Sequence, residues 1–368
     1  MNLDPPKLVA ADCLGCLMKS LFAVLMLCAA SFSPLAWADF DKGLAAFEQG
    51  EFAQALIEFR RAADQGSAQA QFAMAVMYDN GQGVPQDSAQ ALKWYRMAAD
   101  QDHVFAQYNL GVMYAQGQGV AQDYRQARFW YQKAADHGDA DAQYSLGQLY
   151  EGGDGAARDY KEAARWYQLS AEQGNVGAQY SLALLYDTGK GVPQDFKQAV
   201  HWYRLAAEEG DPDAQNNLGV MYAEGQGVPK NYREAVKWFE IAAMQGQASA
   251  QYNLGLRYDN GEGVLKDEKK AMMWYMLAAE QADADALNNL GAMFANGQVV
   301  EADNIMAYAL FNLSAAYDDS EQNNAPRNRD QIGSEMSAAD IEKAQDLSVE
   351  LSKSGRFLEV MEKYVDKL

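Results

Sequence analysis

The chain has 368 residues, and 30 Lys and Arg against 51 Asp and Glu give it a net charge of −21. Nucleic acid is not expected as a partner, because a polyanion needs a basic surface and no block of basic residues interrupts the acidic composition. Hydrophobic residues make up 49% of the chain, enough to build a packed core, so the chain as a whole is expected to fold.

The first 38 residues have the order of a secretory signal peptide. Met18 and Lys19 precede an apolar run, 21–30, and Ala36 and Ala38 supply an A-x-A cleavage site. Residues 1–17 carry acidic residues and are a poor match to the positively charged n-region of a signal peptide, so Met18 is an alternative start of translation. We expect cleavage near Ala38 and a periplasmic or secreted protein that begins at Asp39. The apolar run is too short for a permanent membrane span, so no transmembrane segment is expected in the mature chain.

All three cysteines, Cys13, Cys16 and Cys28, lie in this predicted signal. The mature chain would then contain no thiol. Neither a disulfide framework nor a cysteine nucleophile is therefore expected.

A period of 36 residues organises the rest of the chain. It is carried by six tryptophans: Trp94, Trp130, Trp166, Trp202, Trp238 and Trp274. A second register is carried by glutamines, with a leucine in last place: Gln71, Gln107, Gln143, Gln179, Gln215, Gln251 and Leu287. A repeat of this length predicts a helical solenoid, in which each unit buries its apolar faces against its neighbours.

The unit 104–139 shows how such a repeat folds. Gly117 is expected to end a first helix in the left-handed conformation, and Asp123 with Gln126 forms a capping box that starts a second helix. Residues at helical spacing predict the buried faces. On the first helix these are Ala106, Leu110, Met113 and Tyr114, and on the second they are Ala127, Trp130, Tyr131, Ala134 and Ala135.

The pattern A-x-x-x-L-G-x-x-Y-x-x-G-x-G-V-x-x-D-x-x-x-A-x-x-W-Y-x-x-A-A resembles the Sel-1-like repeat, a relative of the tetratricopeptide repeat. Seven copies cover residues 68–319, with Gly155-Ala156 in place of Gly-Val in the third and Val299 in place of the second glycine in the last. The resemblance implies an all-α, right-handed α/α superhelix. Residues 39–67 resemble a shorter tetratricopeptide-like capping unit, and residues 320–368 resemble the C-terminal capping helices of bacterial members.

No catalytic, cofactor-binding or metal-binding residues are expected. His103, His137 and His201 lie in different units at non-equivalent positions, so they cannot converge on a metal or form a dyad. The Gly-x-Gly pairs follow helices, whereas a phosphate-binding loop follows a strand. Cysteine-rich members of the family have been linked to penicillin-like compounds, but their paired cysteines are missing here.

The first helices carry a candidate partner-binding stripe. Helical geometry places the residue two positions before the consensus leucine on the opposite side of the helix. These residues are Phe72, Tyr108, Tyr144, Tyr180, Asn216, Tyr252 and Asn288. A polar ladder runs beside them: Asn109, Ser145, Ser181, Asn217, Asn253 and Asn289. Acidic residues near the helix ends add negative charge: Asp79, Glu151, Asp187, Glu224 and Asp259.

Two interpretations of the stripe remain open. In one, the tyrosines pack between adjacent helices and the asparagines satisfy backbone groups. In the other, the stripe binds a partner, because tyrosines offer rigid contact area, amides can bond to an extended peptide and acidic rims favour a basic one. First helices line the concave surface in related solenoids.

The sequence thus predicts an exported, non-enzymatic scaffold or adaptor that binds proteins of the bacterial cell envelope. A protein that binds cell wall or polysaccharide is the alternative, and a hydrolase is the third hypothesis. No cofactor is expected, and the partners are envelope proteins with basic or extended segments.

Overall fold

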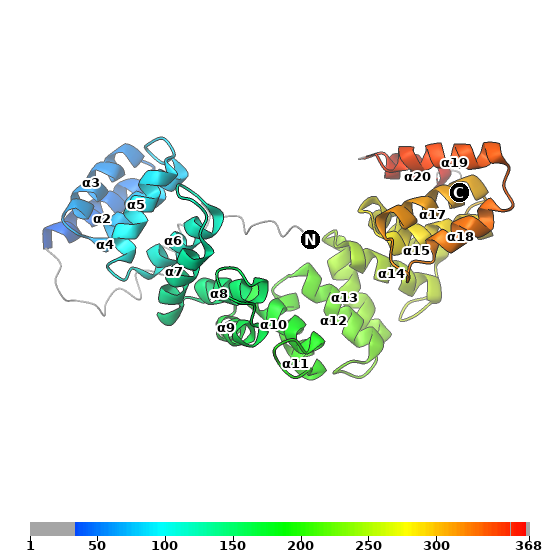
Figure 1. The fold of residues 1–368 in the computed structure, drawn as a ribbon, viewed down its shortest axis with the longest axis horizontal. Helices are drawn as coiled ribbons and strands as arrows, with labels where there is room; N and C mark the ends of the chain where they lie inside the picture. The colour runs from blue at the N-terminus through cyan, green and yellow to red at the C-terminus, as the bar shows by residue number, and fades with distance from the viewer. Residues whose placement is uncertain (1–33, 354, 366–368) are drawn as a thin grey trace. The chain divides into compact units, whose positions relative to one another are not determined.

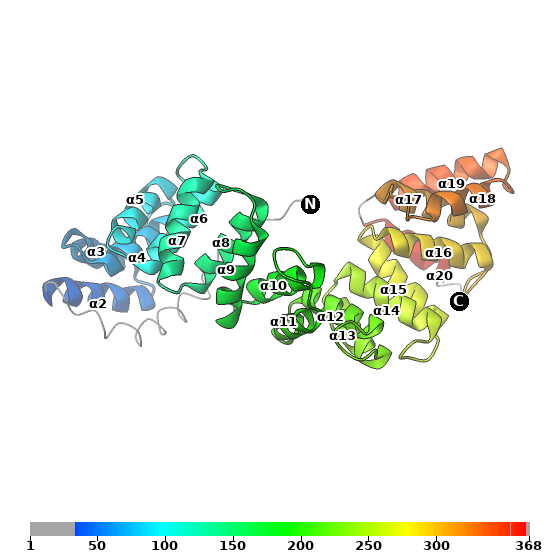
Figure 2. The same ribbon diagram turned by 60° about the horizontal axis from the view of Figure 1, so that its bottom comes forward.

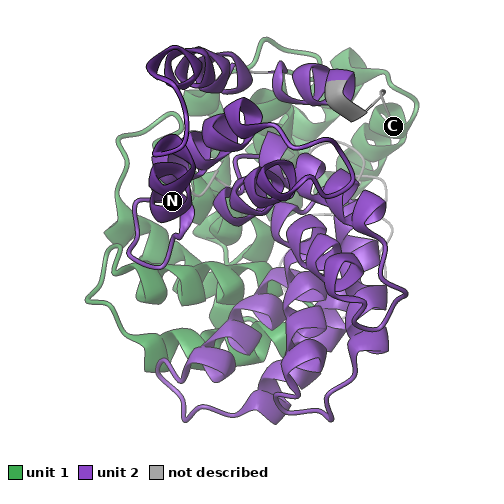
Figure 3. Cartoon of the chain, turned by 90° about the vertical axis from the view of Figure 1, so that its right-hand side faces the viewer, with its two compact units in different colours: residues 1–175 green, residues 176–368 purple. Residues whose placement is uncertain are grey.

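The computed structural model describes residues 34–353 and 355–365, and it forms two compact units, 1–175 and 176–368 (Figure 3). The described residues form helices and no strand, in agreement with the predicted all-α solenoid (Figure 1). Unit 1 contains α2 (Pro34–Glu48), α3 (Phe52–Asp64), α4 (Ala68–Asn80), α5 (Ser88–Ala99), α6 (Val104–Gln116), α7 (Tyr124–Asp136), α8 (Ala140–Gly152) and α9 (Tyr160–Glu172). The three cysteines and Met18 lie outside the described residues.

Unit 2 continues the pairs and ends in three further helices. It contains α10 (Val176–Thr188), α11 (Phe196–Glu208), α12 (Pro212–Glu224), α13 (Tyr232–Met244), α14 (Ala248–Asn260), α15 (Glu268–Glu280), α16 (Ala284–Asn296), α17 (Asn304–Tyr317), α18 (Ala325–Gly333), α19 (Ala338–Leu351) and α20 (Phe357–Val365). Ser337 caps α19, since its hydroxyl accepts from the Asp340 N–H at 3.2 Å. Helix α20 packs against α15, and the Leu358 N–H donates to the Glu280 carboxylate at 3.1 Å.

The predicted buried faces of the unit 104–139 are confirmed on both helices: Ala106, Leu110, Met113 and Tyr114 on α6, and Ala127, Trp130, Tyr131, Ala134 and Ala135 on α7. The glycine that follows the consensus leucine of the first helix, such as Gly111 after Leu110, makes room for an aromatic ring of the second helix. A Cβ on Gly111 would lie 2.5 Å from the Tyr131 ring, so any larger residue there would require the ring to move. Small and large side chains therefore interlock within each pair.

Half of the predicted capping box forms. Asp123 accepts hydrogen bonds from the Arg125 and Gln126 N–H groups at 2.9 and 3.1 Å, as an N-cap should. Its own N–H, which the box assigns to the Gln126 side chain, donates instead to the Tyr114 carbonyl at 2.9 Å. The same backbone bond ties the start of each second helix to the end of the first across the described repeats, so the box prediction is wrong in this part.

The Gly-x-Gly loop of one 36-residue repeat contacts the preceding repeat. Gly117 ends α6 at φ 71°, as predicted, and Gly119 follows at φ 66°. A Cβ on Gly119 would lie 2.5 Å from the Ser88 carbonyl oxygen at the start of α5. The second glycine is therefore required by a close approach of two backbones. In the last unit Val299 occupies this place at φ 69°, a conformation that β-branched residues rarely adopt.

The buried glutamines of the second register link consecutive helices. The Gln71 amide donates to the Ala63 carbonyl at 3.3 Å, and its oxygen accepts from Gln101 at 2.7 Å. Gln143, Gln215 and Gln251 repeat both bonds, with Gln173, Gln245 and Gln281 as their donors. Each glutamine bridge therefore ties one first helix to the second helices before and after it.

The bridge at Gln107 is incomplete. Gln107 is fully buried, yet its side-chain oxygen has no hydrogen-bond partner among the described residues, because His137 stands where the other units supply the donor glutamine. We expect His137→Gln to raise the free energy of unfolding by about 1 kcal/mol, since it satisfies a buried acceptor. Urea unfolding measures the difference. His137→Asn is the matched control, because its shorter amide should not reach, and an equal gain from both variants would contradict this explanation.

Candidate partner-binding surface

The stripe residues lie at equivalent places on successive first helices of each unit. Unit 1 carries Phe72, Tyr108 and Tyr144 on α4, α6 and α8, and unit 2 carries Tyr180, Asn216, Tyr252 and Asn288 on α10, α12, α14 and α16. All are half-buried except Asn216, which is 7% exposed and buried. The stripe is thus part of the packing and part of the surface.

Each stripe ring packs against an aromatic ring of the second helix in its own pair. The ring centroids of Tyr108 and Tyr131 are 5.7 Å apart, and those of Tyr144 and Tyr167 are 5.8 Å apart. The pairs Phe72–Tyr95, Tyr180–Tyr203 and Tyr252–Tyr275 have the same arrangement. Tilted contacts of this length contribute to stability beyond the buried area. Within the chain these rings therefore pack against neighbouring helices, as the first of the two interpretations describes.

The polar ladder is engaged within the protein. The Asn109 amide donates to the Phe105 carbonyl at 2.8 Å in its own helix. In unit 2, Asn253 donates to the Asn216 oxygen at 3.0 Å, and Asn216 donates to Asn217 at 3.2 Å. A peptide bound beside the ladder would therefore have to share or exchange these internal hydrogen bonds.

The predicted acidic rim is partly internal. Tyr167 donates to the Glu151 carboxylate at 2.6 Å, and Tyr203 donates to Asp187 at 3.2 Å. Asp79 is 8% exposed, and burial raises its pKa. These carboxylates accept hydrogen bonds from the hydroxyls of second-helix tyrosines, which need an acceptor when they are buried. The other carboxylates directly follow a tyrosine of the first helix. Ala223 follows Tyr222 instead, so Glu224 lies one position beyond the equivalent place.

Other carboxylates face the stripe, and the sequence analysis missed them. They are pairs at the start of alternate first helices: Asp139 and Asp141, Asp211 and Asp213, Asp283 and Asp285. Each pair raises the pKa of the stripe tyrosine of the preceding repeat, together with burial, which is the larger cause: Tyr108, Tyr180 and Tyr252. For Tyr180 the pKa is raised to about 12. The recurrence of acidic pairs every 72 residues was the available signal.

The first member of each pair is an N-cap. Asp139 accepts from the Ala142 N–H at 2.8 Å, and Asp211 accepts from Ala214 at 2.7 Å. Burial raises the pKa of Asp139 to about 6, and Asp141 contributes to the increase. Two of the second members accept hydrogen bonds from the last residue of their repeat, since Asn175 donates to Asp141 at 2.9 Å and Gln247 donates to Asp213 at 3.2 Å.

The raised pKa of Asp139 predicts a pH dependence of stability. An unfolded aspartate titrates near pH 4. Between about pH 4 and pH 6 the folded chain therefore binds more protons than the unfolded chain, and stability falls as the pH rises. Asp139→Asn keeps a cap acceptor and removes this contribution, so we expect it to be more stable than the parent at pH 7.5 by on the order of 1 kcal/mol and equally stable near pH 4.

Urea unfolding across this pH range tests the expectation. Asp123→Asn, the same change at an exposed N-cap, serves as the control. A deficit of Asp139→Asn at pH 7.5 would show that the charged carboxylate stabilises the fold.

No group of three or more potential metal-ligating side chains occurs in the part of the chain that the structure describes, and none of its helices is long and apolar enough to cross a membrane.

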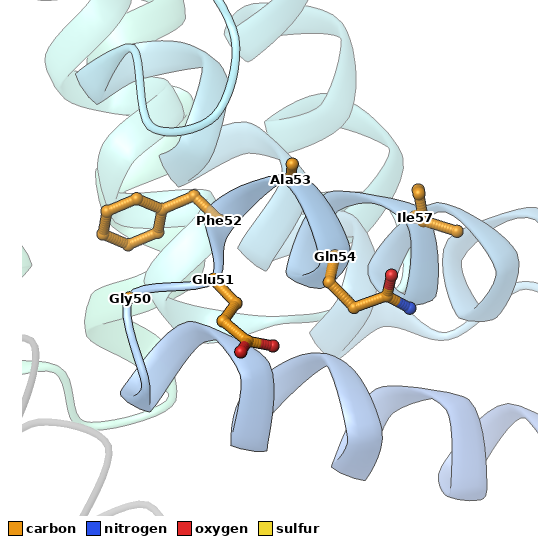
Figure 4. Close-up of a pocket in the computed structure, with 6 residues that line it drawn as sticks. All are labelled: Gly50, Glu51, Phe52, Ala53, Gln54 and Ile57. Carbon is orange, nitrogen blue, oxygen red and sulfur yellow. The ribbon is translucent and has the colours of Figure 1, made fainter.

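His103 caps α6 and stacks on Phe72 with 4.7 Å between ring centroids, and burial lowers its pKa to about 4. At the turn between α2 and α3, six residues line a surface hollow of about 550 Å³, with Gln54 between Glu51 and Ile57 (Figure 4).

Antiparallel helix pairs joined by glycine loops and packed in series define an all-α solenoid (Figure 2). The family model described as Sel1 repeat matches residues 68–103, 104–139, 140–175, 176–211, 212–247, 248–283 and 284–316. The chain therefore belongs to the Sel1 repeat family, whose members are generally protein-interaction scaffolds.

Solved structures of this kind resemble the chain. A Sel1 repeat protein from Oxalobacter formigenes is 33% identical, with a TM-score of 0.57, and the match covers 65% of this chain and 96% of that one. The protein c5321, described as a protective antigen in uropathogenic Escherichia coli with an SLR fold, is 31% identical over 90% of this chain and 85% of its own, with a TM-score of 0.45. No curated protein matches the chain.

Proposed function

We propose that the chain is an exported, non-enzymatic scaffold of the bacterial cell envelope that binds an extended, basic peptide segment along its first helices. The observation that carries this proposal is the charge of these helices. From α4 to α16 the seven first helices contain one basic residue, Arg257, which is paired with Glu262 at 2.6 Å. Half-buried rings and acidic pairs lie on the same helices, so the surface favours a cationic partner.

The chemistry of recognition follows from the neighbours of each tyrosine. Tyr108, fixed against Tyr131, offers one side of its ring at little further cost in side-chain entropy. Asp139 and Asp141 lie close enough to raise its pKa, so a lysine or arginine of the peptide would meet an aromatic ring and two carboxylates together. A bound cation would also relieve the repulsion between the two carboxylates.

Site-specific photo-crosslinking tests the proposed surface. A benzophenone amino acid at Tyr144 keeps an aromatic ring against Tyr167 and should crosslink, in envelope extracts, to a protein segment rich in lysine or arginine. The control position is Leu265, which is 91% exposed in a loop and should react with more proteins but with no preferred one. Glycan adducts at Tyr144 would favour the polysaccharide-binding alternative, and equal adducts at both positions would contradict a site on the stripe.

Export is tested separately by intact mass. We expect the exported protein to begin at Asp39, from the order of Met18, Lys19, the apolar run and Ala36-x-Ala38. Helix α2 begins at Pro34, so this cleavage would remove its first turn, including the buried Ala36. A mass that includes Cys28 would contradict both the cleavage site and the absence of thiols from the mature protein.

A further inference from the structure

Basic residues of unit 1 are confined almost entirely to its second helices. Helices α4, α6 and α8 contain no lysine or arginine, and α2 contains only Lys42. Among the described residues of this unit, the other lysines and arginines, apart from Arg158 in a loop, lie on α3, α5, α7 and α9. The second helices of this unit, taken with their caps, are therefore close to neutral in a chain whose net charge is −21, and the basic residues gather on them.

Exposed apolar residues alternate with these cations. Each second helix of unit 1 presents one apolar and one basic residue four positions apart, which places them on the same face. The apolar members are Ile57, Met97, Phe129 and Leu169, with exposed fractions of 48%, 36%, 50% and 37%. The basic members are Arg61, Lys93, Lys133 and Arg165. The order of the two reverses from one helix to the next, and we name these eight residues the basic–apolar band.

Tryptophan rings fix several of the charges in place. The Arg165 guanidinium lies 4.7 Å from the centre of the Trp166 ring, and Lys133 Nζ lies 5.4 Å from that of Trp130. Beside the band, the Arg60 guanidinium of α3 lies 4.9 Å from the centre of the Trp94 ring of α5, and this contact joins the two helices. A guanidinium stacked on a ring still presents N–H donors at its edge. Three of the band's cations also have carboxylates of the chain beside them, since Arg61 pairs with Glu58 at 3.3 Å, Lys133 with Asp102 at 4.0 Å and Arg165 with Glu162 at 3.3 Å, and a partner would exchange these exposed ion pairs.

Acidic residues border the band on both sides. The caps Asp87, Asp123 and Asp159 are exposed at the starts of these helices, and Asp64, Asp100, Asp136 and Glu172 are exposed at their ends. A flat anionic membrane would face these borders together with the band and be repelled by them. A narrow chain that crosses the helices would contact the band and the three carboxylates paired with it but not the acidic borders, so the charge distribution favours a peptide.

The spacing of the band suits an extended peptide. Neighbouring second helices meet through side chains, as Arg60 of α3 does over Trp94 of α5 and Arg96 of α5 does over Trp130 of α7, and helices in such contact lie on the order of 10 Å apart. A polyproline II segment rises about 3.1 Å per residue with three residues per turn, so every third side chain points the same way at about 9 Å intervals. We propose that the basic–apolar band of unit 1 binds a partner segment in this conformation, in which acidic and apolar residues alternate at every third position. This surface is separate from the tyrosine stripe, and its proposal does not depend on the stripe.

The test uses the full chain and a fluorescent synthetic peptide, Leu-Pro-Pro-Glu-Pro-Pro repeated twice. We expect saturable binding, measured by fluorescence anisotropy, that weakens as salt is added. The double variant Lys93→Glu/Arg165→Glu should weaken binding by about tenfold or more. The matched control, Arg125→Glu/Lys161→Glu, makes the same change of charge in the first turns of α7 and α9, outside the band, and should leave the affinity within about twofold.

A second pair of measurements tests the apolar part and the occupant. Phe129→Ser should weaken binding by more than it lowers stability, because the side chain is half exposed and its aromatic contact within the chain is an edge contact with Trp130, 5.0 Å between ring centroids. Equal losses in the band and control variants, or equal binding of the peptide with lysine in place of glutamate, would overturn the proposal. Binding to phosphatidylglycerol vesicles that is lost in the band variant, with no peptide binding, would assign the band to a membrane and also overturn it.

Discussion

Replacing Trp166 with alanine is expected to lower the free energy of unfolding by about 3–5 kcal/mol. The side chain is 4% exposed and belongs to the main hydrophobic core of unit 1. Removing it leaves a cavity between helices that are held by close contact, and it also removes the support under Arg165. Because the same residue recurs every 36 positions, the loss represents one layer of the solenoid.

Urea unfolding followed by far-ultraviolet circular dichroism measures this loss. Leu169→Ala is the control, since Leu169 lies on the same helix with 37% of its surface exposed. It should cost less than about 1 kcal/mol. If both variants unfold at the parent's urea concentration, the tryptophan does not hold the layer together and the assignment of the buried second-helix face is wrong.

Gly119→Ala is expected to cost about 2–4 kcal/mol, although it adds a single methyl group. Two effects combine. The backbone at φ 66° disfavours any side chain, and the new Cβ would lie 2.5 Å from the Ser88 carbonyl oxygen, which is held in the first turn of α5. A backbone carbonyl cannot rotate away as a flexible side chain can, so the loop has to move away from the preceding unit.

Gly138→Ala separates the two effects. Gly138 also has a positive φ, 90°, but a Cβ there would meet no atom within 4 Å. Its variant should lose about 1 kcal/mol from conformation alone. Thermal melts of both variants give the comparison, and equal losses would mean that contact between the loop and the preceding unit contributes nothing to stability.

The fold could be predicted because its signals are local and repeated. Gly117 ends α6 and Asp123 starts α7, as spacing and cap preference indicated. The destination of the Asp123 N–H could not be predicted, because it depends on how the loop returns to the Tyr114 carbonyl. Likewise, the glutamines were visible as a register, but their bonds join residues 8 and 30 positions apart that only the packed helices bring together.

The candidate surface was predicted less completely. Helical geometry gave the direction of Tyr108 but could not show that its ring lies on Tyr131. The carboxylates chosen by their place at helix ends include Glu151, which accepts from a tyrosine hydroxyl inside its own repeat. The acidic pairs were overlooked because they recur in every second unit, whereas the sequence was compared one unit at a time. A side chain's role at this surface depends on the next unit, which a single repeat does not contain.

These two periods have a consequence for how such a chain can change its length. The core repeats every 36 residues, so gaining or losing one unit would preserve tryptophans, glutamine bridges and loop glycines alike. The acidic pairs repeat every 72 residues, as at Asp139, Asp211 and Asp283. An odd number of added units would therefore leave a sound solenoid whose acidic pairs fall out of step, and only an even number would preserve both the fold and the spacing of these charges. The unit of folding and the unit of charge spacing are different lengths of the same chain.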